Sequence, residues 1–304
     1  MADRSTAKVL TAGSINTDLV ARVRRAPEAG ETITGESFAI FGGGKGANQT
    51  LASARSGVAT AILGAVGDDD FGRQRLADLQ RDHVDIESVR VIPELPSGVA
   101  IITVEDGGEN RISYMPGATL GVTAADAESA VARVQPTAIL TTLELPPDTI
   151  QTLIDRGKAI GATIILNATP EPAVGADLAR QADVLIVNES EARELLGWGS
   201  DEDDWSSAAS ELRERGPQTV VITLGGDGVL VLGQREWRFP APEIAVVDTT
   251  GAGDAFCGAF AAQIAQGATV DRAAQVGVVA GAIAVTKAGA QPSQPYWDEI
   301  ATHL

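Results

Sequence analysis

The residues best suited to chemistry lie in the segment 248–254, which reads Asp-Thr-Thr-Gly-Ala-Gly-Asp. The strand-like residues 245–247 precede it, and the apolar, proline-free stretch 255–265 that follows predicts a helix. Glycines at a helix start let a ligand approach the backbone, and the first N–H groups of a helix can bind an anion. Asp254, in the first turn, could take a proton from a hydroxyl while those N–H groups stabilise the developing anion. A glycine turn capped by Asp254 is the structural alternative.

A second glycine-rich segment, residues 42–48, reads Gly-Gly-Gly-Lys-Gly-Ala-Asn. Its Gly-Lys pair suggests a P-loop, but that motif needs Ser or Thr directly after the lysine, where this chain has Gly46. The chain also lacks a dinucleotide-binding Gly-x-Gly-x-x-Gly between a strand and a helix. What remains is a glycine loop that displays Lys45 and Asn48 to a polar ligand, or a plain turn.

Two further pairs of polar residues follow predicted strands. Asn16 and Asp18 alternate on an extended segment, so they point the same way and could bind two hydroxyls, unless they form an Asx turn. Asn188 and Glu191 follow the apolar run 184–187, at the strand end where open α/β sheets bind ligands. They could hold a phosphate and a hydrated Mg²⁺, or could simply cap a helix.

Two loops and one isolated acid complete the set of candidates. Residues 223–228, Thr-Leu-Gly-Gly-Asp-Gly, could admit a flat ligand or a phosphate, form a tight hairpin into 229–232, or do both. Residues 284–293 form an irregular loop whose carbonyls and hydroxyl suit a monovalent cation. Glu144 is a lone acid before two prolines, at the end of a predicted strand.

The composition excludes several kinds of chemistry and partner. His83 and His303 lie outside every candidate cluster, which argues against histidine acid–base chemistry, a Ser/His/Asp triad and a zinc site. The chain of 304 residues has 41 acidic and 23 basic side chains, and a net charge of −18 argues against nucleic acid or an anionic membrane as the main partner. Cys257, the single cysteine, rules out an internal disulfide and is expected to pack as a small hydrophobe.

Hydrophobic patterning indicates where the chain resides. The N-terminus has no apolar leader segment, and the most apolar run, 276–285, is about half of the roughly 20 residues that a membrane span needs. Together with the single cysteine, this predicts a cytoplasmic chain in a reducing compartment.

The elements that must position these residues alternate along the chain. Short apolar runs alternate with longer helical stretches, which predicts a mainly parallel sheet covered by helices on both faces. The expected strands are 9–12, 61–66, 138–143, 163–166, 184–187 and 220–224. The expected helices are 46–56, 71–82, 124–134, 149–159 and 190–196.

Two regions depart from this alternation. Residues 17–41 alternate polar and apolar, and 97–114 predicts a β-hairpin that turns at Asp106-Gly107-Gly108. Half-exposed strands of this kind predict a small separate sheet that serves as a lid, a dimer interface, or both. We therefore expect a main α/β domain of residues 1–15, 42–96 and 115–304, with a β-lid of approximately 16–41 and 97–114.

Taken together, these segments resemble the PfkB carbohydrate kinase family, and within it the ribokinase group most closely. The matches run in family order from about residue 8 to the C-terminus, and the two glycine signatures at this separation are specific. One local departure is Phe41-Gly42, where the phenylalanine is expected one position later. The matching segments are 13–18, 43–49, 188–192, 223–225, 248–254 and 282–293.

The resemblance implies a fold and a reaction. The implied fold is an α/β three-layer α/β/α sandwich, with a mainly parallel central sheet and a small β-sheet lid. The implied reaction is ATP-dependent phosphorylation of a sugar's primary hydroxyl, O5 of D-ribose in the ribokinase group. Deoxyribose, a nucleoside or another furanose stays open as the acceptor, as does a sugar-binding protein without catalysis. Mg²⁺, an activating K⁺ and a homodimer formed through the lid strands are also implied.

The resemblance also implies residue roles, which we carry over as expectations. The general base is Asp254, and the anion hole is formed by the N–H groups of Gly251, Ala252 and Gly253. The residues that hold sugar hydroxyls are Asn16, Asp18, Gly44, Lys45, Asn48 and Glu144, and those that cover the sugar from the lid are Ala100 and Ile102. The residues implied to bind Mg²⁺ and phosphate are Asn188 and Glu191. Those implied to line the nucleotide site are Thr223, Gly225 and Gly228. The K⁺ loop comprises Asp248, Thr250, Ala284, Lys287, Gly289 and Ser293, several of them through backbone carbonyls.

Overall fold

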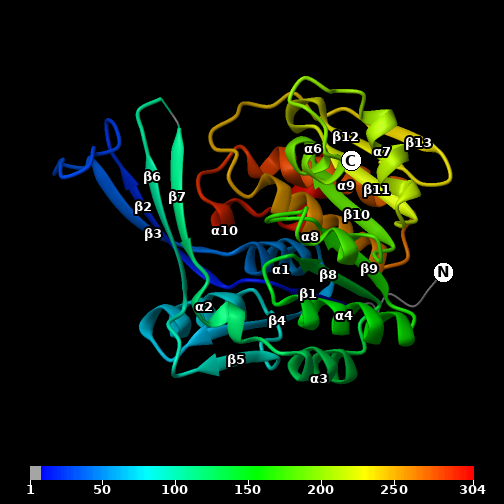
Figure 1. Cartoon of the computed structure of the whole chain (residues 1–304), viewed down its shortest axis with the longest axis horizontal. Helices are drawn as coiled ribbons and strands as arrows, with labels where there is room; N and C mark the ends of the chain where they lie inside the picture. Colours follow the sequence, from blue (N-terminus) through cyan, green and yellow to red (C-terminus); the bar gives the residue numbers. More distant parts are fainter. Residues whose placement is uncertain (1–7, 108) are drawn as a thin grey trace.

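The computed structural model describes residues 8–107 and 109–304 and contains a nine-stranded sheet beside a four-stranded one (Figure 1). The order in the larger sheet is β13-β12-β11-β10-β9-β8-β1-β4-β5, and every neighbouring pair from β11 to β5 is parallel. Its strands are β1 (Lys8–Ala12), β4 (Ala59–Gly67), β5 (Val89–Ile92), β8 (Ala138–Thr142), β9 (Thr163–Asn167), β10 (Val184–Asn188), β11 (Thr219–Thr223), β12 (Val229–Leu232) and β13 (Glu236–Phe239).

Helices cover both faces of this sheet, so the prediction of three α/β/α layers is confirmed (Figure 1). The helices on one face are α3 (Ala124–Val134), α4 (Pro147–Ala159), α5 (Ala176–Ala179), α6 (Glu189–Leu196) and α7 (Trp205–Glu214). Those on the other face are α1 (Lys45–Arg55), α2 (Asp70–Arg81), α8 (Ala252–Ala265) and α9 (Val270–Ala284). The short elements are η2 (Gly117–Gly121), η3 (Gly225–Asp227), α10 (Ala290–Ser293) and α11 (Trp297–Ala301). Within the described residues, no helix is both long and apolar enough to span a bilayer.

The strand expected at 245–247 is wrong. Residues 240–250 are irregular, and Val246 and Val247 are 63% and 66% exposed. The N–H groups of Val247 and Asp248 both donate to the carbonyl of Val285, just beyond the end of α9. Residues with high strand propensity form a strand only where a neighbouring strand offers a row of backbone partners, and a single carbonyl does not.

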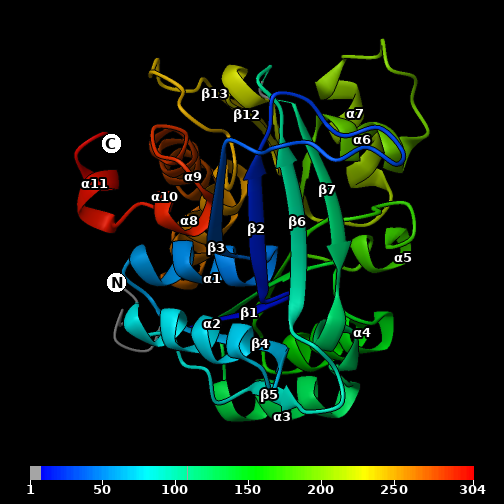
Figure 2. The same cartoon turned by 90° about the vertical axis from the view of Figure 1, so that its left-hand side faces the viewer.

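The four-stranded sheet confirms the predicted lid, and its strand order is β3-β2-β6-β7. It stands to one side of the main domain in Figure 1 and is seen face-on in Figure 2. The β6–β7 hairpin forms as expected, although Gly108 in its turn lies outside the described residues, as do residues 1–7. The lid strands are β2 (Asn16–Arg22), β3 (Ser37–Gly43), β6 (Gly98–Val104) and β7 (Asn110–Met115).

Helix α2 and its N-cap form hydrogen bonds to two segments at the base of the lid. The carboxylate of Asp69, which caps this helix, accepts hydrogen bonds from Ser97 N at 2.8 Å and Ser97 Oγ at 2.6 Å, directly before β6. Farther along α2, the buried guanidinium of Arg75 donates to the carbonyl of Phe41 in β3 at 2.8 Å. The helix therefore sets where the lid strands leave the main domain.

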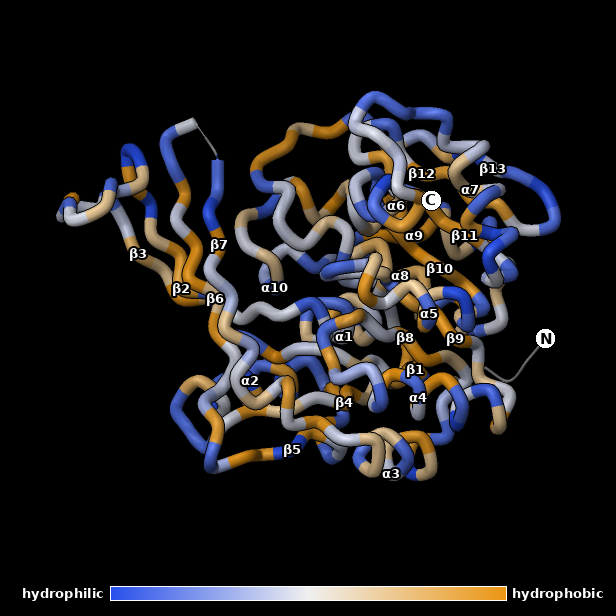
Figure 3. Tube along the Cα trace, in the orientation of Figure 1, coloured by the Kyte–Doolittle hydropathy of each residue, from blue (hydrophilic) through white to orange (hydrophobic). Residues whose placement is uncertain are grey.

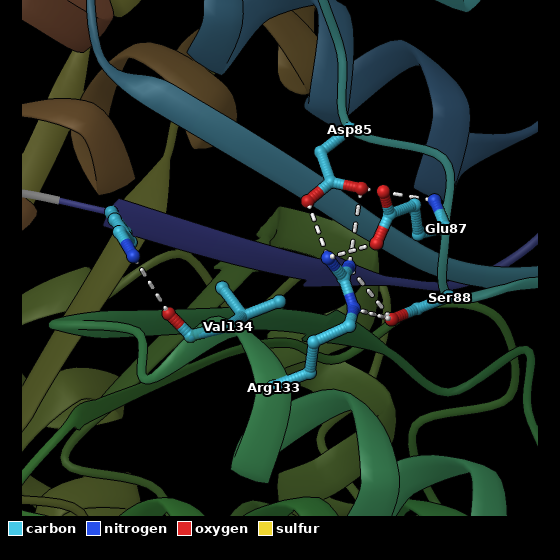
Figure 4. A network of polar contacts seen from close by, with 6 residues as sticks. Asp85, Glu87, Ser88, Arg133 and Val134 are labelled. Atoms are coloured by element: carbon cyan, nitrogen blue, oxygen red, sulfur yellow. Dashed lines mark hydrogen bonds and ion pairs between the residues drawn. The ribbon is translucent and has the colours of Figure 1, made fainter.

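A polar network joins α3 to the loop before β5, the edge strand of the nine-stranded sheet (Figure 4). Arg133, near the end of α3, reaches the carboxylates of Asp85 at 2.7 Å and Glu87 at 3.2 Å, and the hydroxyl of Ser88 at 3.0 Å. These partners lie in the loop that leads into the edge strand β5. Exposed ion pairs contribute only about 0.2–1 kcal/mol each, so the network orients this edge more than it stabilises it.

Candidate active site

The carboxyl ends of the parallel strands meet at one edge of the sheet, where they border a cavity of about 230 Å³. Parallel strands place the residues that follow them at the same edge, so residues far apart in sequence converge there. The predicted residues that line this cavity are Lys45, Asn188, Glu191, Thr223, Gly251, Gly253 and Asp254. They are joined by Asn167, Thr169, Ile186, Val187 and Cys257.

Asp254 is held from both sides by amides of α1. Its Oδ2 accepts a hydrogen bond from Asn48 Nδ2 at 2.9 Å, and its Oδ1 accepts one from Gln49 Nε2 at 3.0 Å. These hydrogen bonds require α1 to pack closely against α8. The two helices do so, since a Cβ at Gly258 would lie 2.4 Å from the Cβ of Ala52. Burial raises the pKa of Asp254, while Lys45 and the two amides act in the opposite direction.

The helix start beside Asp254 leaves open space for a ligand. Gly251 is the N-cap of α8 and has φ +80°, a conformation that favours glycine. Gly253 is exposed, and a Cβ there would meet nothing within 4 Å. Glycine inside a helix costs roughly 0.5–1 kcal/mol relative to alanine. Because no neighbouring group requires that glycine, the space is suited to an anion at the start of the helix, where the first N–H groups have no partner within the helix itself.

Lys45 brings a positive charge to the cavity. Burial works against its ammonium, yet the carboxylates of Asp254, Glu144 and Glu191 outweigh that effect and raise the pKa of Lys45. The side chain therefore stays protonated where it borders the cavity. It lines the same cavity as Asn188, Glu191 and the glycines at the start of α8.

Asn188 and Glu191 form a capping box and line the cavity at the same time. Asn188 Oδ1 accepts from Glu191 N at 2.9 Å, and Glu191 Oε2 accepts from Asn188 N at 2.8 Å. Burial raises the pKa of the Glu191 carboxyl, against hydrogen bonds and Lys45 that lower it. Within residues 8–107 and 109–304, no group of three His, Cys, Asp or Glu could hold a metal. One carboxylate and one amide suit Mg²⁺, which keeps waters and binds through phosphates.

Two buried asparagines near the site carry unmet hydrogen-bonding capacity. Asn16 and Asn48 are 4% and 5% exposed, and the Oδ1 atom of each has no hydrogen-bond partner among the residues that the structure describes. A buried acceptor without a donor costs about 1–3 kcal/mol. A ligand rich in hydroxyls would supply the missing donors.

The predicted lid residues share one face of the lid, and Gly44 lies close to the end of β1. Ala100 and Ile102 pair with Asp18 and Val20 of β2, which puts them on the same face of the lid as Asp18. Gly44 has φ +89°, and a Cβ there would lie 2.6 Å from the carbonyl of Ser14, so the backbone runs close to the end of β1.

Glu144 joins the ends of two strands. Its carboxylate accepts hydrogen bonds from Ser14 N at 2.9 Å, Ser14 Oγ at 2.6 Å and Thr142 Oγ1 at 3.0 Å. It also accepts a longer one from Gly46 N at 3.4 Å. The side chain therefore fixes the loop after β1 and the glycine-rich start of α1, beside the asparagines.

The two segments of the predicted cation loop lie side by side. Asp248 Oδ1 accepts from Thr250 N at 2.9 Å, and Asp248 Oδ2 accepts from Gly289 N at 2.9 Å. The Ser293 hydroxyl donates to the carbonyl of Ala290 at 2.8 Å, and Lys287 N donates to the carbonyl of Ala284 at 3.1 Å. Apart from the carboxylate of Asp248, the atoms of this loop that could bind a cation are mostly neutral oxygens. Such oxygens fit a monovalent ion better than a divalent one.

The nucleotide candidates lie on the turn after β11. Thr223 lines the cavity, and Gly225 and Gly228 lie in the tight turn to the antiparallel strand β12, so the predicted hairpin is confirmed. Both glycines have positive φ, +52° and +94°, and a Cβ at Gly225 would meet nothing within 4 Å. The turn therefore leaves room beside the cavity for a flat group.

Comparisons with known proteins identify the family. The profile described as pfkB family carbohydrate kinase matches residues 6–297. Ribokinase from Mus musculus is 35% identical over 99% of this chain and 96% of its own length. Deoxyribokinase from Salmonella typhi is 32% identical over 96% of this chain and 97% of its own. The chain belongs to the pfkB family of carbohydrate kinases.

Solved structures agree with the fold of this PfkB kinase. Arabidopsis thaliana ribokinase complexed with ribose and ATP matches with a TM-score of 0.86 at 27% identity, over 97% of each chain. Ribokinase from Giardia lamblia matches with a TM-score of 0.88 at 28% identity, over 98% of each chain. The ribokinase-like sandwich with a β-lid is therefore confirmed.

Sequence reasoning missed polar residues in the cavity of this PfkB kinase. Gln49 Nε2 donates to both Asp254 Oδ1 and Asn167 Oδ1, each at 3.0 Å, so it links α1, α8 and β9. Asn167 ends β9 as Asn188 ends β10, and that shared position was the available signal. Cys257 is buried as expected, and burial raises its pKa.

The charge on Asp18 generates a prediction about the stability of this PfkB kinase. Burial raises the pKa of Asp18 from 3.8 to about 6, although Arg75 lowers it. Because the pKa is raised in the folded state, the contribution of this carboxyl to the free energy of unfolding falls as the pH rises from about 4 through about 6. Asp18→Asn should therefore raise the free energy of unfolding, by up to about 3 kcal/mol near neutral pH and by less near pH 5, as measured by urea unfolding.

Asp69→Asn is the control, for which the change in the free energy of unfolding at neutral pH should have the opposite sign. Burial works to raise the pKa of Asp69, but hydrogen bonds from Ser97 and Gly72 prevail and lower it, so its contribution is present at neutral pH and lost in acid. This variant should lose stability near pH 7. A loss of stability in Asp18→Asn at neutral pH would contradict our account of Asp18.

Proposed function

We propose that this kinase transfers the γ-phosphoryl group of ATP to the primary 5-hydroxyl of D-ribose, giving ribose 5-phosphate and ADP. The observation that carries the proposal is the buried carboxylate of Asp254 in the first turn of α8, bordering the same cavity as Gly251, Gly253 and Lys45. A base, an anion site and a cation within one cavity are what phosphoryl transfer needs.

In this proposal Asp254 takes the proton of the sugar hydroxyl as the oxygen attacks the γ-phosphorus. Its raised pKa brings it closer to the working pH, where a general base is most effective. The N–H groups of Gly251, Ala252 and Gly253 stabilise charge on the transferring group, and the ammonium of Lys45 adds to that field. Phosphoryl transfer depends on such positioning and charge stabilisation more than on covalent chemistry.

The unmet acceptors of Asn16 and Asn48 support a sugar as the substrate. In this proposal the unpaired Asn16 Oδ1 and Asn48 Oδ1 accept from sugar hydroxyls, and Asp18 adds a carboxylate from the lid strand β2. We propose that Gly44, Lys45 and Glu144 complete the polar wall, and that Ala100 and Ile102 cover the sugar when the lid closes. Closing expels water that would otherwise compete as the acceptor.

We propose distinct roles for the remaining candidates. Asn188 and Glu191 would hold hydrated Mg²⁺ on the ATP phosphates, and Mg²⁺ neutralises charge during transfer. The nucleotide would lie along Thr223, Gly225 and Gly228. An activating K⁺ would be held by the loop of Asp248, Thr250, Ala284, Lys287, Gly289 and Ser293. Because Gln294 Nε2 in this region donates to the carbonyl of Gly251 at 3.2 Å, order in the loop is coupled to the anion site.

Deoxyribose is the second candidate acceptor, because the matching relatives include a deoxyribokinase as well as ribokinases. A panel of ribose, deoxyribose, fructose and adenosine distinguishes the two, with ADP release measured in KCl and in choline chloride. We expect ribose to give the highest kcat/KM, and K⁺ to raise the rate. A preference for deoxyribose would replace the proposed substrate, and no ADP release with any acceptor would overturn the proposed activity.

Asp254→Asn tests the role of the base. The variant should lose roughly 10²–10⁴-fold in kcat, as expected for a removed general base, while calorimetry still detects sugar binding. Asp271→Asn is the control, because Asp271 is likewise an acid in the first turn of a helix, α9, but lies outside the cavity. Sugar binding lost together with turnover would show that Asp254 acts structurally.

We also propose a homodimer formed through the outer face of the lid, in a reducing cytoplasmic setting. Ile40, Leu19 and Ile101 lie opposite one another across the lid strands, on the face turned away from Asp18. Ile40 and Ile101 are exposed, and Figure 3 colours the middle of the lid strands hydrophobic. An exposed apolar sheet face is suited to pairing with a second copy.

Sedimentation velocity tests the dimer. Wild type should sediment as a dimer at micromolar concentration, and Ile40→Asp should shift it toward monomer because a charge enters an apolar contact. Ile160→Asp, at a comparably exposed isoleucine after α4, should leave the dimer intact. A monomeric wild type would refute the proposed dimer.

A further inference from the structure

Tyr114 belongs to the face of the lid that turns toward the site. It lies on β7 directly opposite Ala100 of β6, and Ala100 lies opposite Asp18 of β2. Residues directly opposite in neighbouring strands share a face of the sheet, so the three side chains form one row. Tyr114 is 39% exposed, so part of this large side chain is accessible.

Polar side chains surround the phenol at the base of the lid. Burial and the charge of Glu144 raise the pKa of Tyr114, while Asn16, Thr119 and Ser14 lie close enough to lower it. Two of these neighbours belong to other elements: Asn16 begins β2, and Thr119 lies in η2 of the main domain. The phenol thus faces groups from the lid base and the main domain together.

These neighbours are incompletely satisfied. The Oδ1 atom of Asn16 and the Oγ1 atom of Thr119 are buried, and within residues 8–107 and 109–304 neither has a hydrogen-bond partner. A phenol can donate one hydrogen bond and accept another, and a threonine hydroxyl can do the same. Leaving such groups unpaired is costly, so a hydroxyl among the three would be bound favourably and selectively.

We propose that Tyr114 is a specificity-determining residue whose phenol, with Asn16 and Thr119, binds a sugar hydroxyl other than the one that is phosphorylated. The proposal rests on the proposed sugar kinase activity. The reacting hydroxyl belongs beside Asp254 and its partner Asn48, whereas Tyr114 lies on the side of Ser14 and Glu144. A hydroxyl bound there would join the lid to the main domain, because Tyr114 is carried by the lid and Thr119 is not.

The test combines Tyr114→Phe with sugars that each lack one hydroxyl. Calorimetric affinity and kcat/KM are measured for ribose, 1,4-anhydroribitol, 2-deoxyribose and 3-deoxyribose. Tyr114→Phe should weaken ribose binding about tenfold, the effect of one lost hydrogen bond. For the one analogue that lacks the contacted hydroxyl, wild type and variant should bind equally. Thr119→Val, which removes the facing hydroxyl with little change in shape, should give the same pattern.

Tyr296→Phe is the matched control, because the chain has two tyrosines and the Tyr296 hydroxyl bonds to Asp82 outside the site. It should bind every sugar as wild type does. Ribose binding unchanged in Tyr114→Phe, or an equal loss with all four sugars, would overturn the proposal.

The two proposals fail in different ways. ADP release with ribose by both wild type and Tyr114→Phe at equal kcat/KM would remove only the role of Tyr114. Ribose binding that depends on Tyr114, without ADP release, would remove only the kinase activity. If wild type binds none of these sugars, both proposals are wrong.

Discussion

The close packing of α1 against α8 is the contact on which the site depends. Gly258 permits the approach, and as a result amides of Asn48 and Gln49 reach both oxygens of Asp254. The carboxylate is then buried, oriented and paired before any ligand arrives. A preorganised group of this kind needs no rearrangement at the moment of reaction, which is a main source of catalytic rate.

The lid is positioned by charges that also affect the site. Asp69 and Arg75 on α2 fix the strands at the base of the lid, and Arg75 also lowers the pKa of Asp18 against the effect of burial. The same helix therefore affects both the position of the lid and the charge of a residue in lid strand β2. Burying Asp18 costs folding energy, and functional sites commonly carry such a cost.

The net charge of −18 is compatible with the binding of an anion because the site depends little on basic side chains. Helix N–H groups at the start of α8 and a single ammonium, that of Lys45, face the cavity. Three carboxylates surround that ammonium and raise its pKa, so the cavity itself is not strongly positive. A phosphate in this cavity is therefore best accommodated together with a cation. The neutral and carboxylate oxygens at the edges of the cavity are suited to binding that cation.

Local sequence determined the helices, the alternating lid strands and the two glycine segments, because spacing and periodicity act over a few residues. Those patterns were enough to select Asp254, Lys45 and Asn188 as candidates. Tertiary structure decided what no local pattern encodes: residues 245–247 form no strand because no neighbouring strand pairs with them. It also decided that Gln49 reaches Asp254 and that Tyr114 faces Asn16, since each contact joins elements far apart in the chain. Such contacts depend on how the layers pack, which the chain specifies only as a whole.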